Sequence, residues 1–306
     1  MRILFHDLTV PPEPWLGFLR QAFPQASVEL WQPGAAPADY ALVWAPPQQL
    51  LDEQTQLKAL FQIAAGVDAL LKLRLPIGVP VFRLDDAGMA VQMAEYVCHA
   101  VIRHFRELDK VEADTRAGRW QQRQPRSRAE FSVGVLGLGV LGQRVLKALE
   151  AFEFPLRGWG RTPRHLNGVQ TFAGPQELPG FLAASRVLVN LLPLTPETEN
   201  LLNTQTLSQL QPGGYLINVA RGRHLVDEDL LALLGSGHLA GATWMCSARN
   251  RCPQSMLFGA MRASPSRRTP RPARCARTAW PRSWPKFAPW KQGQRHRAWA
   301  AWCGSK

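Results

Sequence analysis

The segment Gly137-Leu-Gly-Val-Leu-Gly142 constrains the fold more than any other feature of this chain. Residues 131–136 before it are apolar and typical of a buried strand, and residues 141–152 after it have helical periodicity. At a strand-to-helix turn the first glycine permits the turn, the second lets backbone approach a pyrophosphate, and the third lets helix pack on strand. We therefore predict a dinucleotide site contacted by Gly137, Leu138, Gly139, Val140, Leu141 and Gly142, with phosphates at the helix amino terminus.

The rest of the first 243 residues alternates in the same way between short apolar runs and amphipathic stretches, which predicts an α/β fold. We expect strands over residues 2–6, 40–44, 157–160, 187–192 and 215–219, an apolar segment over 57–63, and helices over 14–23, 89–110 and 227–234. Residues 116–129 are polar, basic and contain proline, so we expect an exposed linker there.

The residues after the predicted strand 157–160 bear on the choice of cofactor. A site for NAD carries an acidic residue about 20 positions after the glycines, where it binds the ribose 2′-hydroxyl. This chain has Arg161-Thr162-Pro163-Arg164 there, and a guanidinium pairs with a 2′-phosphate. We predict NADPH as the cofactor, with NADH possible but weaker, and Arg161 and Thr162 as contacts; the alternative is an exposed basic turn.

Composition divides the chain at residue 243. Residues 244–306 hold 14 of the 36 Lys and Arg residues and no Asp or Glu, whereas the preceding body is close to neutral. A nucleic-acid-binding body is therefore excluded. We see no apolar run long enough to span a bilayer, no signal peptide and no metal-ligand spacing, and Cys98 is the one cysteine before residue 244. We expect a cytoplasmic protein without a metal site.

Five motifs together resemble the D-isomer-specific 2-hydroxyacid dehydrogenases. They are Ala64-Ala-Gly-Val-Asp68, Gln92-Met-Ala-Glu-Tyr-Val97, the glycine turn, Asn190-Leu-Leu-Pro-Leu-Thr-Pro-Glu-Thr198 and Gly214-Tyr-Leu-Ile-Asn-Val-Ala-Arg-Gly222. The resemblance covers residues 1 to about 243, and Trp44 with Arg161-Thr162 is more particularly similar to the glyoxylate/hydroxypyruvate reductase A branch.

The resemblance implies two α/β domains around a cleft. Residues 1–98 would form a flavodoxin-like substrate domain, completed in relatives by the C-terminal segment, and residues 99–243 a Rossmann-type, doubly wound NAD(P)-binding domain. Residues 244–306 would be an aberrant, irregular basic tail rich in Trp, Pro and Arg. Family members are commonly homodimers that act on small 2-oxo acids, without membrane or nucleic-acid partners.

The resemblance also implies residue roles. Arg221 would hold the substrate carboxylate and polarise the carbonyl, as the catalytic residue that remains. The backbone of Ala65 and Gly66 would meet the same carboxylate, and Trp44 would wall the pocket or be an ordinary core aromatic. The nicotinamide and its ribose would contact residues of two loops, Leu192, Pro193, Thr198, Val219, Ala220 and Arg221.

The family's general acid, a His beside a Glu, is missing. The family places these residues in Leu-Asp-Val-Phe-x-x-Glu-Pro-Leu and Pro-His-x-Ala, and neither motif occurs here. We expect His224 and His238, which stand elsewhere, to be solvent-exposed. Adding one base after the Thr243 codon permits both motifs to return in one shifted frame, so we hypothesise that the tail is frameshifted.

The function that follows is NADPH-dependent reduction of glyoxylate and hydroxypyruvate, impaired in this chain by loss of the acid pair. One alternative is a catalytically inactive dinucleotide-binding or co-repressor-like protein. A less favoured alternative is nucleic-acid binding by the basic, Trp-rich tail.

Overall fold

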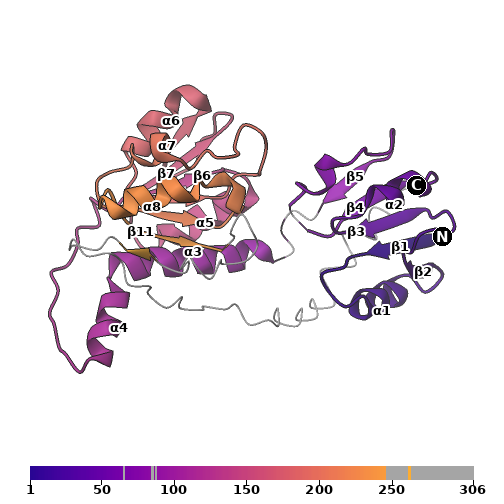
Figure 1. Ribbon diagram of the computed structural model, residues 1–306, viewed down its shortest axis with the longest axis horizontal. Helices are drawn as coiled ribbons and strands as arrows, with labels where there is room; N and C mark the ends of the chain where they lie inside the picture. Colours follow the sequence, from indigo (N-terminus) through magenta and orange to yellow (C-terminus); the bar gives the residue numbers. More distant parts are fainter. Residues whose placement is uncertain (65, 84–85, 87, 246–260, 263–306) are drawn as a thin grey trace.

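The computed structural model describes residues 1–64, 66–83, 86, 88–245 and 261–262. They form two units, one built on a parallel sheet and the other on a mostly parallel sheet, which Figure 1 shows side by side. The sequence-predicted α/β class is therefore confirmed. Residues 246–260 and 263–306, which make up most of the predicted tail, lie outside the described residues.

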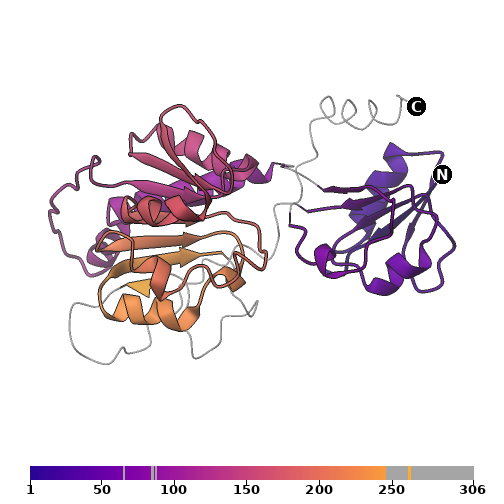
Figure 2. The same ribbon diagram turned by 90° about the horizontal axis from the view of Figure 1, so that it is seen from above.

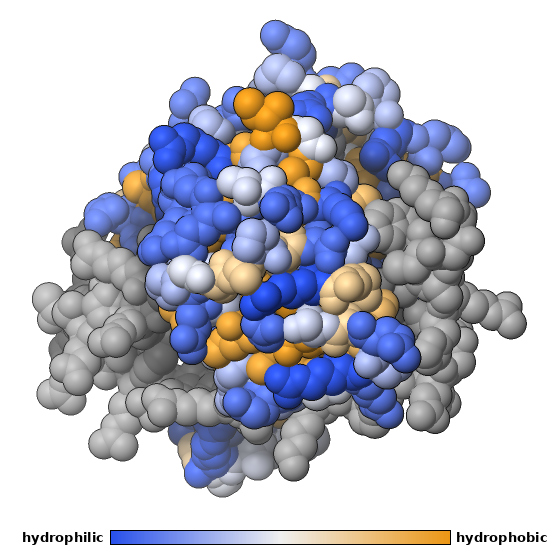
Figure 3. Space-filling model, turned by 90° about the vertical axis from the view of Figure 1, so that its right-hand side faces the viewer, coloured by the Kyte–Doolittle hydropathy of each residue, from blue (hydrophilic) through white to orange (hydrophobic). Residues whose placement is uncertain are grey.

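The first unit has the strand order β2-β1-β3-β4-β5, with every pairing parallel. Its elements are β1 (Arg2–His6), α1 (Glu13–Ala22), β2 (Ser27–Leu30), β3 (Tyr40–Val43), α2 (Gln48–Glu53), β4 (Ala59–Gln62), the 3₁₀ turn η1 (Leu70–Lys72) and β5 (Val81–Arg83). Two apolar layers cover the sheet, one around Leu4 and Leu60 and the other around Phe5 and Leu19. On the face seen in Figure 3, hydrophilic side chains predominate and hydrophobic ones lie in small groups between them.

The second unit has the strand order β12-β11-β10-β9-β6-β7-β8. Its strands are β6 (Val133–Leu136), β7 (Leu156–Gly160), β8 (Val169–Ala173), β9 (Val187–Asn190), β10 (Gly214–Asn218), β11 (Leu239–Trp244) and β12 (Met261–Arg262). Its helices are α3 (Met89–Phe105), α4 (Leu108–Arg116), α5 (Val140–Glu150), α6 (Gly174–Ala183), α7 (Thr204–Leu207) and α8 (Asp227–Gly235), with the 3₁₀ turn η2 (Gly222–His224). Among the described strands of this sheet only β12 runs antiparallel, and it pairs two tail residues with β11.

The order of these strands creates a crevice at the carboxyl end of β6. The chain leaves β6 toward β7 and β8, and then returns to place β9 on the other side of β6. Loops that follow β6 and β9 therefore diverge at this point, which is where doubly wound sheets bind ligands. Figure 2 shows the two units and this sheet from above.

Helix α3 ends earlier than predicted. We expected one helix over 89–110, but Glu107 has φ +52° and separates α3 from α4, which projects from the unit in Figure 1. The Glu107 carboxylate accepts a local hydrogen bond from Lys110 and a long-range one from Arg126, and these contacts stabilise the break. Before it, Met93 and Val97 pack in the core of the second unit, so the predicted domain boundary at residue 98 lies within a helix of that unit.

Candidate active site

The glycine turn lies at the crevice of the second sheet. Gly137 has φ +100°, which favours glycine, and a Cβ on it would lie 3.0 Å from the Leu191 carbonyl oxygen. A Cβ on Gly142 would lie 1.8 Å from the Gly137 carbonyl oxygen, so α5 packs directly on the turn. Gly139, by contrast, has no atom within 4 Å of a built Cβ among the described residues, and it is the N-cap of α5. The turn therefore leaves open space beside a helix amino terminus, as a bound phosphate requires.

The other residues of the turn anchor it or face outward. Leu138 is buried, and a Cβ on Gly158 would lie 2.5 Å from its Cδ2, so this leucine packs on β7. Val140 is exposed and Leu141 is half-buried. The Gly137 N–H donates to the Trp159 carbonyl, which ties the turn to β7.

Arg161 and Thr162 are exposed directly after β7, the strand that pairs with β6. A hydrogen bond with the Thr195 side chain is the main cause of a lowered pKa of Glu197, and the positive charge of Arg161 adds a smaller contribution. Since Glu197 belongs to the loop after β9, Arg161 stands on the same edge of the sheet as that loop. This position leaves its guanidinium open to a ligand at the glycine turn.

Two buried asparagines join the loops that follow β9 and β10. Asn190 Nδ2 donates to Asn218 Oδ1 at 3.1 Å, and both side chains are 0% exposed. Asn190 Oδ1 accepts the Leu192 N–H, and Asn218 Nδ2 donates to the Arg221 carbonyl. Their role was not predicted from the sequence, although each asparagine lies in a predicted strand and within one of the five motifs, and each is the last residue of the observed strand. They fix the two loops against each other at the crevice.

Arg221 extends from the β10 loop to the first unit. Its Nε donates to Asp68 Oδ1 at 3.2 Å, its Nη2 lies 3.1 Å from the same oxygen, and its Nη1 donates to the Ala220 carbonyl at 2.9 Å. A Cβ on Gly66 would lie 1.9 Å from Nη2, so any other residue at this position would displace the guanidinium. Gln62, 1% exposed, donates to the Gly66 carbonyl and holds the turn. The structure thus brings together Arg221 and Gly66, whereas Ala65 lies outside the described residues.

His224 is buried, so the prediction that it is solvent-exposed was wrong. Its side chain is 0% exposed, with Nδ1 3.2 Å from the Arg221 backbone nitrogen and Nε2 3.3 Å from the Pro193 carbonyl oxygen. Nδ1 also lies 3.0 Å from the Arg221 carbonyl oxygen. We assign the proton to Nε2, because in this tautomer both ring nitrogens are hydrogen-bonded: Nε2 donates to the Pro193 carbonyl and Nδ1 accepts from the Arg221 N–H. Burial lowers the pKa of His224, which keeps the ring neutral. His238 is half-buried, and its Nε2 has no hydrogen-bond partner among the described residues.

The remaining predicted site residues lie on the same two loops or at the end of β3. Val219 and Ala220 are buried, Leu192 is 8% exposed, and Pro193 is exposed. Thr198 donates to the Pro193 carbonyl and closes the β9 loop on itself. Trp44 is half-buried at the end of β3, which leaves open both its pocket role and its role as a core aromatic.

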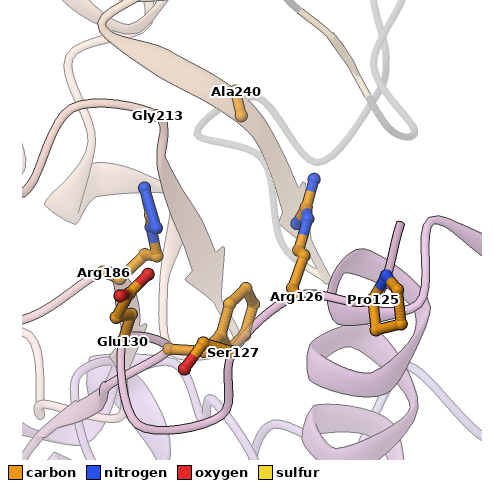
Figure 4. A pocket seen from close by; sticks show the side chains of 8 residues that line it. Pro125, Arg126, Ser127, Glu130, Arg186, Gly213 and Ala240 are labelled. Carbon is orange, nitrogen blue, oxygen red and sulfur yellow. The ribbon is translucent and has the colours of Figure 1, made fainter. Parts of the chain in front are cut away.

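A separate hollow of about 490 Å³ lies at the opposite edge of the second sheet. Phe131, Arg186 and Gly213, which line it, precede β6, β9 and β10, so it opens at the amino ends of the strands. Figure 4 shows Arg126 and Arg186 on its two sides. Both guanidiniums donate to backbone carbonyls. The hollow is therefore distinct from the crevice that carries the glycine turn.

Comparison with known proteins is consistent with this geometry. The NAD binding domain of the D-isomer specific 2-hydroxyacid dehydrogenases matches residues 98–255. A glyoxylate/hydroxypyruvate reductase A of Serratia proteamaculans is 45% identical over 265 residues, which are 84% of this chain and 85% of the relative. No helix among the described residues is long and apolar enough to cross a membrane.

Two solved structures share the architecture of both units. A D-isomer specific 2-hydroxyacid dehydrogenase from Xanthobacter autotrophicus, in complex with NADPH and MES, has a TM-score of 0.78 and 40% identity over 83% of each chain. An NADPH-dependent glyoxylate/hydroxypyruvate reductase from Sinorhizobium meliloti, in complex with NADP and sulfate, has a TM-score of 0.76 and 32% identity over 83% of each chain. On the matched domain and these identities, the chain belongs to the D-isomer specific 2-hydroxyacid dehydrogenase family.

Proposed function

We propose that this chain binds NADPH and reduces small 2-oxo acids, glyoxylate and hydroxypyruvate among them, to 2-hydroxy acids. The observation that carries the proposal is that Arg221 and the glycine turn stand on one edge of the second sheet, with Arg221 directed at Gly66 of the first unit. A carboxylate ligand and a dinucleotide would therefore meet at the same crevice. The relatives named above, with their NADPH and NADP complexes, support the choice of cofactor.

The residues present fit the cofactor. NADPH, when bound, supplies the hydride that is added to the substrate carbonyl carbon. Gly137 to Gly142 would hold the pyrophosphate at the open side of Gly139. Arg161 and Thr162 would bind the 2′-phosphate, and Leu192, Pro193, Thr198, Val219 and Ala220 would line the nicotinamide end.

Arg221 would orient the substrate. In the structure Nε and Nη2 of its guanidinium contact Asp68, and Nη1 donates to the Ala220 carbonyl. One N–H on Nη1 and one on Nη2 remain available to a ligand. These groups can grip the carboxylate of a 2-oxo acid and draw charge toward its carbonyl oxygen. Gly66, Ala65 and Trp44 would close the pocket from the side of the first unit.

The supply of a proton to the reduced substrate limits the turnover of this chain. The new alkoxide needs a proton, and the family's His and Glu do not occur in their motifs here. His224 does not replace them, because both of its ring nitrogens are committed to Arg221 and Pro193. We propose that water provides the proton and that turnover is slower than with a general acid, which is typically worth about 10²–10⁴-fold.

Two measurements test the proposal separately. NADPH binding is followed by nicotinamide fluorescence, and glyoxylate-dependent NADPH oxidation by loss of nicotinamide absorbance. We expect binding together with slow oxidation. Binding without any oxidation would favour a catalytically inactive dinucleotide-binding protein, and loss of binding altogether would contradict the proposal.

A further inference from the structure

Asp68 of the first unit and Arg221 of the second form an ion pair across 153 positions of sequence. One carboxylate oxygen, Oδ1, faces both Nε and Nη2 of the guanidinium. A built Cβ on Gly66 would lie 3.1 Å from this same oxygen, so the pair sits directly on the Gly66 turn. No step of the proposed reaction uses Asp68.

The pair is open to a ligand. The side chain of Arg221 is 37% exposed and that of Asp68 is 30% exposed, so a small anion can reach the guanidinium without unfolding the site. Asp68 occupies the Nε side, and each Nη atom retains an N–H that the described residues do not use. A ligand carboxylate can therefore bind Arg221 while Asp68 remains in place, but the two carboxylates then share one positive charge.

We propose that Asp68 is a specificity-determining residue that limits the site to ligands with one carboxylate. The inference rests on the proposed function, because it assigns the acceptor of the carboxylate to Arg221. With Asp68 present, the Arg221 pair is already neutral, so a monocarboxylate gains little charge stabilisation beyond its hydrogen bonds. A diacid brings a second negative charge within a Debye length of Asp68, and this charge is repelled.

The size of the effect follows from charge separation. Two unit charges about 4 Å apart in water-like surroundings interact by an amount equivalent to about a fivefold change in affinity. Removing the Asp68 charge should therefore tighten binding of a monocarboxylate about fivefold, and binding of a diacid whose second carboxylate also lies about 4 Å from Asp68 about 25-fold. The ratio of the two affinities should shift about fivefold toward the diacid.

The test is calorimetric titration with glycolate and with tartronate, which differ by one carboxylate, on the full chain. Asp68→Asn keeps an oxygen for Arg221 and removes the charge, Asp68→Glu keeps the charge, and Asp52→Asn removes a carboxylate from the exposed Arg74 ion pair as the matched control. We expect Asp68→Asn alone to raise the tartronate-to-glycolate affinity ratio about fivefold, with the gain diminished in 0.5 M salt.

If Asp68 had a merely structural role, Asp68→Asn would weaken binding of glycolate and of tartronate equally. An unchanged tartronate-to-glycolate affinity ratio in Asp68→Asn would overturn the inference, and so would the absence of binding by every variant. Titration requires no turnover, so the outcome is separate from that of the reduction assay. A chain that reduces glyoxylate while the ratio stays constant would contradict only the role of Asp68.

Discussion

Replacing His224 by alanine should loosen the two loops that carry Arg221 and Pro193. The substitution leaves the Arg221 N–H without its acceptor and removes a side chain that is 0% exposed. An orphaned, part-buried donor costs about 1–2 kcal/mol, and the cavity adds about 1 kcal/mol. Loss of the contact with the Pro193 carbonyl costs less, because Pro193 is exposed and water can take the place of the imidazole ring. We expect the free energy of unfolding to fall by about 2–3 kcal/mol.

The assay is urea unfolding followed by tryptophan fluorescence, with His165→Ala as the matched control. His165 is exposed, so its replacement should change the free energy of unfolding by less than about 0.5 kcal/mol. His224→Asn can still accept from the Arg221 N–H and should recover more stability than His224→Ala. A His224→Ala protein as stable as the His165→Ala protein would refute the hydrogen bonding assigned to the buried ring.

Three further predictions concern the same edge of the sheet. Arg161→Asp should weaken NADPH about 10- to 150-fold in fluorescence titrations and favour NADH, because a charge-assisted contact worth about 1.5–3 kcal/mol is lost; an unchanged NADPH dissociation constant would show that Arg161 is only a surface residue. Gly142→Ala should abolish dinucleotide binding, because its Cβ would lie 1.8 Å from a carbonyl oxygen, whereas Gly235→Ala, with nothing within 4 Å, should bind normally. Acid should destabilise the fold in urea titrations: burial lowers the pKa of His224 and of His6, so the unfolded chain binds more protons and stability falls as pH drops below about 6.5. His224→Asn should weaken the dependence of the free energy of unfolding on pH. An unaltered slope of that free energy against pH would contradict the assignment of the effect to His224.

The sequence predicted the glycine turn and the strands β1, β3, β6, β7, β9 and β10, because strand, turn and helix signals are local. It did not predict β2, β5, β8 or β11, which are not buried throughout. It also placed Arg221 in the site through a motif. It did not predict that Asp68 pairs with Arg221, because the partners are 153 positions apart and meet only when the two units fold.

His224 shows a second limit of prediction from the sequence. His224 stands three positions after Arg221, and the local sequence indicates an exposed loop residue there. In the structure the ring is buried, and its Nε2 contacts the carbonyl of Pro193, 31 positions earlier. The break at Glu107 has the same origin, since Arg126 holds its carboxylate from 19 positions away while the local sequence still favours helix. Tertiary contacts decided these two features, and no local pattern reports them.

The most direct test of the account is to insert one base after the Thr243 codon and compare glyoxylate-dependent NADPH oxidation by the two proteins. We expect the restored frame to bring back the family's Glu and His together and to raise turnover by about 10²–10⁴-fold, with a pH dependence that the chain as written lacks. Equal rates for the two proteins would contradict the claim that this chain lacks its general acid.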